Sequence, residues 1–287
     1  MPDADIYFVV NQGKTDLNER FAFGIKNLVP ELWYADQGVI RRVHDWKEEG
    51  DSTYVQLVLH PDESVFVVFP KNTKKTSPNL TLPAVDVLKE SNRVVNGSWK
   101  VKFEPKLDKK FERNISKLFD FSTHSDPSIK YFSGTATYIK DIKVEKYLID
   151  GNKRVILDLG EMNDIAEVKI NGKNVDVLWY PPYRTDITPW LKSGTNKLEI
   201  SVTNNWANRL IGDEQYPADF EWGQDRGLQM GRAMKAFPDW FIQKKTRPSK
   251  ERKAFCIWSY YRKDSPLQPA GLVGPVQLIE QTIKVYE

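Results

Sequence analysis

The chain has 287 residues, with 42 Lys or Arg and 39 Asp or Glu, so its net charge is +3. This near balance argues against nucleic-acid binding and against attraction to an anionic membrane surface. One cysteine excludes an internal disulfide, and no apolar run reaches the ~18 residues that a membrane-spanning helix needs. The aromatic content of 12% suits both the cores of β-sandwiches and stacking against sugar rings.

Short alternating runs predict a small antiparallel β-sandwich over residues 1–70. Runs of this kind, separated by turn residues, are typical of sandwich folds. Residues 71–80 are polar, charged and without periodicity, which predicts a linker. The N-terminus has no basic segment followed by a long apolar core, so no secretory signal is expected in this chain. The expected strands are Ile6–Val10, Arg20–Ile25, Pro30–Trp33, Val39–Val43, Tyr54–Leu59 and Val65–Phe69.

A second domain is expected over residues 81–287. Residues 108–130 read as irregular, and the pattern fails again in a long loop at about 206–254. A loop of that length inside a compact domain is usually functional or mobile. Cys256 lies in an apolar run and reads as a small buried hydrophobe. The expected strands outside the central run are Trp99–Phe103, Phe132–Ile142, Val155–Leu159, Phe255–Tyr261 and Val276–Tyr286.

The central run, Ile165–Trp206, shows how this second domain is built. Alternating side chains on both sides of Asn171-Gly172 predict a hairpin, since Asn-Gly favours positive φ at both turn positions. Pro181-Pro182 then predicts an extended crossing. Residues 186–189 read as a turn or short helical start, and 198–202 as a further strand. The pattern is that of an antiparallel β protein.

Several motifs of this run resemble a known family. Val168-Lys-Ile-Asn-Gly-Lys followed by Tyr183-Arg-Thr-Asp-Ile-Thr resembles the sugar-binding jelly roll of family 2 glycoside hydrolases. Together with Asn204–Asp213, Lys130–Tyr138 and Gly271–Val276, it is similar to the C-terminal region of α-L-rhamnosidase-type enzymes of glycoside hydrolase family 106. The resemblance spans nearly the whole chain and is strongest from Trp99 onward.

This resemblance implies an all-β fold, a small β-sandwich followed by a galactose-binding-like jelly roll. It implies a non-catalytic, carbohydrate-facing portion of a larger hydrolase, with a rhamnose-containing glycan as ligand. In that family the catalytic carboxylates lie on an upstream barrel, which would be this chain's partner in a periplasmic or secreted parent. Because the sequence enters a strand almost at once, we expect a fragment of a longer protein. A purely structural module that packs against a barrel is a further interpretation.

The 206–254 loop offers a second interpretation, a glycosidase in its own right. Hydrolysis needs two carboxyl groups across the scissile bond. Three of the loop's aspartates, Asp213, Asp219 and Asp225, are also candidates for a structural calcium ion, whereas the few histidines and the single cysteine form no zinc motif. The basic end of the loop, Lys244–Lys253, reads as a solvated tip. The candidate catalytic carboxylates are Asp213, Glu214, Asp219, Glu221 and Asp225.

Three strand ends combine aromatic rings with groups that hydrogen-bond to hydroxyls, which is the chemistry of sugar recognition. The two groups that flank the long loop are expected to converge. Asp264 is included because family 2 enzymes place an Asp shortly before their final strand. Two of these residues have a structural alternative. Asn204 could serve only to hydrogen-bond the backbone groups at a strand end, and Trp206 could be a core residue. The candidate carbohydrate-binding residues are Trp179, Tyr183, Arg184, Asn204, Trp206, Arg209, Trp258, Tyr260 and Asp264.

Overall fold

The computed structural model describes residues 3–43, 45–71, 81–82, 85–225, 227 and 231–285. Most of the predicted linker, residues 72–80, therefore lies outside the described residues. The chain is all-β with short helices, as the sequence predicts. Within the described ranges, no helix combines the length and the apolar character needed to cross a bilayer.

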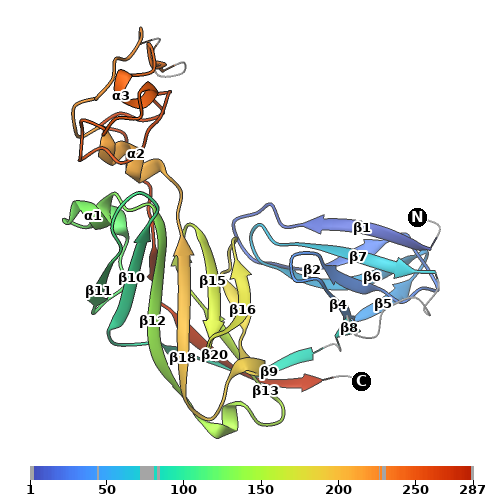
Figure 1. The fold of residues 1–287 in the computed structure, drawn as a ribbon. Coiled ribbons are helices and arrows are strands. Elements are labelled where there is room, and N and C mark those ends of the chain that lie inside the picture. Colours follow the sequence, from blue (N-terminus) through green and yellow to red (C-terminus); the bar gives the residue numbers. More distant parts are fainter. Residues whose placement is uncertain are drawn as a thin grey trace.

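The described strands up to residue 82 form two sheets, which we call the N-terminal sheets (Figure 1). One has the order β1-β7-β3-β4-β8 and the other the order β2-β6-β5. Side chains such as Phe23, Leu57 and Phe69 are buried in their shared core. The bounds are β1 (Ala4–Val10), β2 (Leu17–Phe23), β3 (Glu31–Tyr34), β4 (Val39–Arg42), β5 (Trp46–Glu49), β6 (Ser52–Leu59), β7 (Ser64–Pro70) and β8 (Thr81–Leu82).

The rest of the chain builds a second sandwich with its own core. One sheet has the order β11-β10-β12-β18-β15-β16 and the other the order β17-β13-β20-β9, beside the short pair β14-β19. Trp99, Tyr138 and Leu157 are among the fully buried side chains of this core. The bounds are β9 (Val85–Val94), β10 (Trp99–Pro105), β11 (Phe111–Ile115), β12 (Gly134–Val144), β13 (Lys153–Asp158), β14 (Glu161–Met162), β15 (Ile165–Ile170), β16 (Lys173–Leu178), β17 (Arg184–Asp186), β18 (Gly194–Thr203), β19 (Leu272–Gly274) and β20 (Gln277–Val285).

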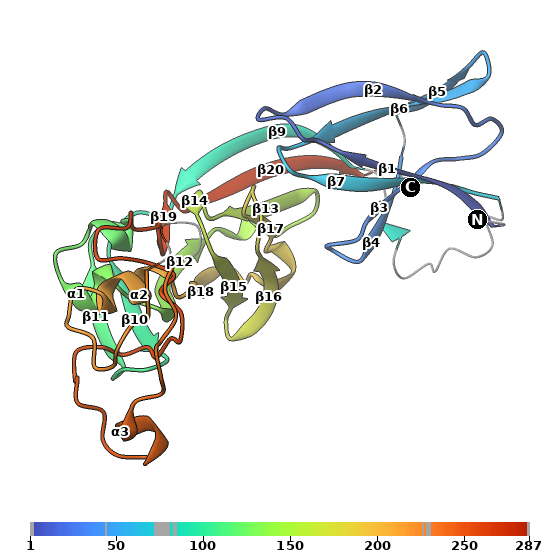
Figure 2. The ribbon, with the colours of Figure 1, turned by 90° about the horizontal axis from the view of Figure 1, so that it is seen from above.

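Helical segments are short and lie at the ends of this second sandwich. Three are single 3-10 turns, at Phe121–Thr123, Lys146–Leu148 and Thr188–Trp190. The long excursion after β18 carries α2 and α3 and rises above the ends of β10, β12 and β18 (Figure 1). Figures 1 and 2 both place it at the end of the second sandwich that is far from the N-terminal sheets. The α-helices are α1 (Pro127–Lys130), α2 (Ala207–Asp213) and α3 (Asp239–Ile242).

The central run folds as its pattern predicts. β15 and β16 form an antiparallel hairpin, and its turn residues Asn171 and Gly172 have φ values of 53° and 79°. β18 pairs with β15 on one side and β12 on the other. The predicted helical start after Asp186 is the 3-10 turn Thr188–Trp190.

Other expectations differ from the structure. Phe255–Tyr261 is not a strand, and Cys256 is half-buried there; its apolar residues pack within the excursion, where Trp258 makes an isolated bridge to Ala233. β9 and β11 were not expected, because nearly all of their side chains are exposed and show no alternation. β8 pairs with β4, which joins residues 81–82 to the N-terminal sheets. The division at residues 70 and 81 stays a prediction.

A buried amide joins the hairpin turn to β18. Asn196 is fully buried, and its Nδ2 donates to the Lys192 carbonyl at 2.7 Å. Its Oδ1 accepts from the Lys192 amide and from Asn171 Nδ2, each at 2.9 Å. These bonds close the turn that starts β18 and bind it to the turn of the β15–β16 hairpin.

We predict that Asn196→Ala destabilises the fold by ~2–4 kcal/mol, because it removes a fully buried side chain and its three hydrogen bonds to Lys192 and Asn171, at ~0.5–1.5 kcal/mol each. Urea unfolding followed by tryptophan fluorescence measures this loss. Thr195→Ala, at an exposed position of the same strand, is the control and should change stability by less than about 1 kcal/mol. Equal effects of the two substitutions would contradict the assigned role.

Candidate functional site

The excursion is tied together by one buried carboxylate. Asp213, at the end of α2, is 2% exposed. Its Oδ2 accepts from the amides of Ala254 at 2.7 Å and Lys253 at 3.0 Å, and its Oδ1 lies 3.0 Å from Arg209 Nη2. The first helix of the excursion and residues 253–254 are therefore joined at one point.

Two arginines extend this polar core. Arg252 is 6% exposed and donates to the Asp213 carbonyl at 2.8 Å and to Glu214 Oε1 at 2.6 Å. Arg247 donates to Asp219 Oδ2 at 2.6 Å. The interpretation of Lys244–Lys253 as a solvated tip is therefore wrong for both arginines. Both arginines form ion pairs with acids of low exposure, Asp219 and Glu214, so their charges are not free in solvent.

The candidate catalytic and calcium-binding acids are held in ion pairs, and Asp213 and Glu214 line the same small cavity. Each one is paired with a base, and the described residues 3–285, with their gaps, contain no cluster of three or more metal-type side chains. The hydrogen bond from Lys235 and the positive charge of that side chain hold the pKa of Glu221 below its ordinary value. The pairs are Asp213–Arg209, Glu214–Arg252, Asp219–Arg247, Glu221–Lys235 and Asp225–Arg262.

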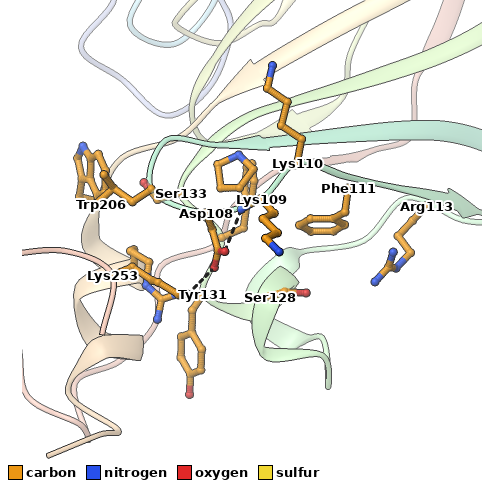
Figure 3. Close-up of a pocket in the computed structure, with 14 residues that line it drawn as sticks. Asp108, Lys109, Lys110, Phe111, Arg113, Ser128, Tyr131, Ser133, Trp206 and Lys253 are labelled. Carbon is orange, nitrogen blue, oxygen red and sulfur yellow. Dashed lines mark hydrogen bonds and ion pairs between the residues drawn. The ribbon is translucent and has the colours of Figure 1, made fainter. Parts of the chain in front are cut away.

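A pocket of about 280 Å³ lies beside α2 (Figure 3). The loop between β10 and β11 forms one wall, α1 and the residues after it form a second, and the start of α2 forms a third. Its volume is near the lower end of the ~300–1,000 Å³ typical of small-ligand pockets. The lining residues are Pro105, Leu107, Asp108, Lys109, Lys110, Phe111, Arg113, Ser128, Tyr131, Phe132, Ser133, Trp206, Arg209 and Lys253.

Aromatic rings line this pocket at several points. Trp206 stands at the N-cap of α2 with 41% of its surface exposed, so it is not a core residue. Tyr131 packs directly on α2, where a Cβ on Gly212 would lie 2.5 Å from its Cγ. That approach requires glycine at position 212. The Arg209 guanidinium lies 5.9 Å from the centre of the Tyr131 ring, which fixes both side chains.

The pocket is positively charged. Its lining holds five basic side chains and one acidic one, Asp108. Partial burial opposes ionisation of Asp108, but bonds from the Lys109 amide and from Lys253 and the nearby Arg209 charge hold its pKa below the ordinary value. Lys253 Nζ lies 3.1 Å from Asp108 Oδ2. Asp108 is therefore an ionised group that already has partners.

Of the nine predicted carbohydrate-binding residues, the structure brings Trp206 and Arg209 into this pocket. Asn204 has the structural role that was the alternative. Its Oδ1 accepts from the Gly134 amide at 2.9 Å, and its Nδ2 donates to the Phe132 carbonyl at 2.8 Å. These bonds hold the end of β18 against the start of β12.

The crossing between β16 and β17 lies against the N-terminal sheets. The Tyr180 hydroxyl donates to the Asp36 carboxylate in the β3–β4 turn, and burial raises the pKa of Tyr180 with help from that bond. Trp179, which is 60% exposed, meets the Tyr180 ring edge-on. Arg184 Nε lies 2.8 Å from Asp158 Oδ2. Tyr183 packs on the second core.

The third predicted group is separate as well. Trp258 and Tyr260 line a different cavity of about 20 Å³, together with Asp213 and Arg252. That volume holds roughly one water molecule and no sugar. Asp264 is exposed in the turn after Arg262 and lines neither of these two cavities. The two groups that flank the loop thus line different cavities, and their convergence on one sugar stays a prediction.

Sequence reasoning missed most of the pocket. The loop before β11, Tyr131 and Lys253 come from three separate segments that the fold brings together. The basic run around Lys109 and Lys110 was the available signal, but such runs are usually solvated.

Comparisons with known proteins place this architecture among glycoside hydrolases. A family model described as a "Glycosyl hydrolase 2 galactose-binding domain-like" matches residues 120–248. A putative β-glucuronidase of Formosa agariphila is 43% identical over 182 residues, which is 63% of this chain and 15% of that protein. A rhamnosidase structure from Novosphingobium sp. PP1Y covers 98% of this chain with a TM-score of 0.74 and 31% identity, and the match is 23% of that chain.

The chain thus spans less than a quarter of the length of either relative. Its residues 120–248, most of them in the second sandwich, are similar to the galactose-binding-like domain of glycosyl hydrolase 2 proteins. The predicted fold class is confirmed.

Asp164, just before β15, is an ionisable group that sequence reasoning did not single out. Burial raises its pKa to about 6, although the amides of Gly271 and Asn205 donate to it and oppose the rise. Its Oδ2 is buried without a hydrogen-bond partner among the described residues. Its charge also raises the pKa of Tyr183, after the larger effect of burial on that hydroxyl.

We predict that Asp164→Asn stabilises the protein at pH 8 and not at pH 4. The folded pKa of Asp164 lies above the ordinary value of 3.8, so the folded state binds more protons between these values and loses stability as pH rises through them. Full conversion of the shift gives ~3 kcal/mol, but solvent still reaches the carboxyl, so we expect about 1 kcal/mol, or ~2 °C in Tm. Melting curves from pH 4 to 8 measure it.

The exposed acid Glu167 on β15 provides the control. The difference in Tm between Glu167→Gln and the unsubstituted protein should be the same at every pH. A constant offset for Asp164→Asn across the same range would show that its carboxyl is not a strained charge.

Proposed function

We propose that this chain is the non-catalytic, carbohydrate-facing portion of a larger α-L-rhamnosidase-like glycoside hydrolase of family 106. The observation that carries the proposal is the likeness to the Novosphingobium rhamnosidase, which extends over 98% of this chain. The matched part is 23% of that enzyme, so the remainder of such a parent has room for a catalytic barrel. The barrel is then the partner of this chain.

The condition of the acidic residues supports a non-catalytic role. A glycosidase needs one carboxyl with a raised pKa as general acid and a second across the scissile bond. Asp219 and Asp225 have lowered pKa values. Burial alone would raise the pKa of Asp219, but its hydrogen bond and ion pair with Arg247 outweigh that effect. At Asp225 the hydrogen bond from the Gly227 amide is the main cause of the lowering. The alternative of a glycosidase in the 206–254 loop therefore has no support from these side chains.

The carbohydrate-facing role rests on the pocket beside α2. Trp206 presents an exposed ring, and backbone and side-chain donors surround it. Exposed rings of this kind stack on the apolar face of a sugar. A rhamnose-containing glycan is the ligand that the rhamnosidase relative favours, whereas the name of the Formosa relative favours a glucuronide.

We expect the purified chain not to hydrolyse 4-nitrophenyl α-L-rhamnoside or 4-nitrophenyl β-D-glucuronide above the rate of buffer. The reason is that each of the five candidate catalytic acids is already paired with a base. Release of nitrophenol measures the rate. Turnover that disappears in Glu221→Gln or Asp225→Asn would establish the catalytic alternative instead.

We also expect Trp206→Ala to weaken saccharide binding at least tenfold while lowering Tm by no more than a few degrees, because its ring is partly in solvent. Isothermal titration calorimetry with methyl α-L-rhamnoside and methyl β-D-glucuronide measures the affinity. Trp179→Ala removes an equally large exposed ring outside the pocket and should leave binding unchanged. If neither sugar binds the unsubstituted chain at millimolar concentration, the purely structural interpretation replaces this one.

A further inference from the structure

We propose that the pocket beside α2 takes a saccharide bearing a negative charge, a carboxylate or a sulfate ester, and that the Lys109 ammonium contacts this group. The proposal rests on the carbohydrate-facing role above and adds the charge class of the ligand and the residue that reads it. It follows from how the charges of the pocket are paired.

Four of the five basic side chains that line the pocket have anionic partners. Lys253 lies by Asp108 and Arg209 by Asp213, and Lys110 Nζ lies 2.6 Å from Glu104. Arg113 is 3.6 Å from Asp126 and 4.9 Å from the centre of the Phe111 ring. Within the part of the chain that the structure describes, which includes the segments before and after Lys109, this lysine has no carboxylate partner.

Lys109 is also the lysine that faces inward. It and Lys110 are neighbouring, exposed residues of the loop that leads into β11. Figure 3 shows Lys110 pointing away from the other lining side chains, while the Lys109 ammonium extends toward Ser128 and Phe111. The unpaired charge therefore lies inside the pocket.

A second donor nearby is incompletely used. Arg209 has 15% of its side chain exposed and gives Nη2 to Asp213, but its Nε is buried without a hydrogen-bond partner among the described residues. Buried donors normally have partners. An anion in the pocket would add negative charge beside this guanidinium, where the acidic lining residue Asp108 is already bonded by Lys253.

The rings and the volume indicate a sugar as the carrier of the charge. Trp206 offers an apolar face, and its exposed fraction of 41% leaves that face open to a ligand. A volume of about 280 Å³ suits one sugar residue more than a long oligosaccharide. A ligand that places its negative group at Lys109 and its sugar ring on Trp206 would be a uronate or a sulfated monosaccharide.

Calorimetric titration of the full chain with four probes tests the proposal: methyl β-D-glucuronide, methyl β-D-glucoside, glucose 6-sulfate and methyl α-L-rhamnoside. We expect at least one charged probe to bind at least tenfold more tightly than both neutral probes. The glucuronide and the sulfate distinguish the two sources of charge. The preference should fall severalfold between 50 mM and 500 mM NaCl, since salt screens the interaction.

Lys109→Gln should reduce the affinity for the preferred charged probe at least fivefold and leave the neutral probes unchanged. Lys110→Gln removes the same charge from the adjacent residue and should reduce it less than twofold. Melting curves of both variants verify that they are folded. Equal losses of affinity in the two variants would mean that the overall positive charge of the region attracts the probe without a contact to Lys109, which overturns the proposal.

The outcomes also separate this proposal from the one on which it rests. If all four probes bind with similar affinity in a manner that needs Trp206, the carbohydrate-facing role stands and the preference for anions is wrong. If none binds, the carbohydrate-facing role fails, and this proposal fails with it.

Discussion

The buried carboxylate of Asp213 is the constraint on which the candidate site depends. An ionised group at 2% exposure is tolerated only when its oxygens have hydrogen-bonded partners. Those partners are the backbone amides of Lys253 and Ala254 and a guanidinium one turn earlier in α2. Meeting the needs of one carboxylate therefore fixes the direction of α2, the place of Arg209 and the path of the chain at Lys253.

The pocket inherits its walls from this arrangement. Trp206 precedes α2 and Lys253 ends the basic segment, and both reach the pocket because Asp213 holds the two segments together. Gly212 contributes by admitting the Tyr131 ring against the helix. The site is therefore built from polar contacts outside the sheets, while the sheets supply the rigid floor.

The sheets were largely predictable from the sequence, and the excursion was not. Alternation identified β6, β10, β15 and β18 because one face of each is buried. It failed for β9, whose side chains are almost all in solvent. Inside the excursion, Arg247 and Arg252 read as solvated charges, since composition cannot show that each faces a buried acid. Trp206 and Arg209 were found because they follow a strand end, whereas their neighbours in the pocket come from segments distant in sequence.

The joining of the excursion at its base has an evolutionary consequence. The segment from Asp213 to Lys253 begins and ends at the contacts of one carboxylate, and residues 232–234 inside it also bond to residues 257–259. Exposed segments with closed ends are the places where natural proteins accept insertions and deletions. The tip that carries α3 lies away from the sheets (Figure 1), so a change in its length would leave the cores of the two sheets undisturbed.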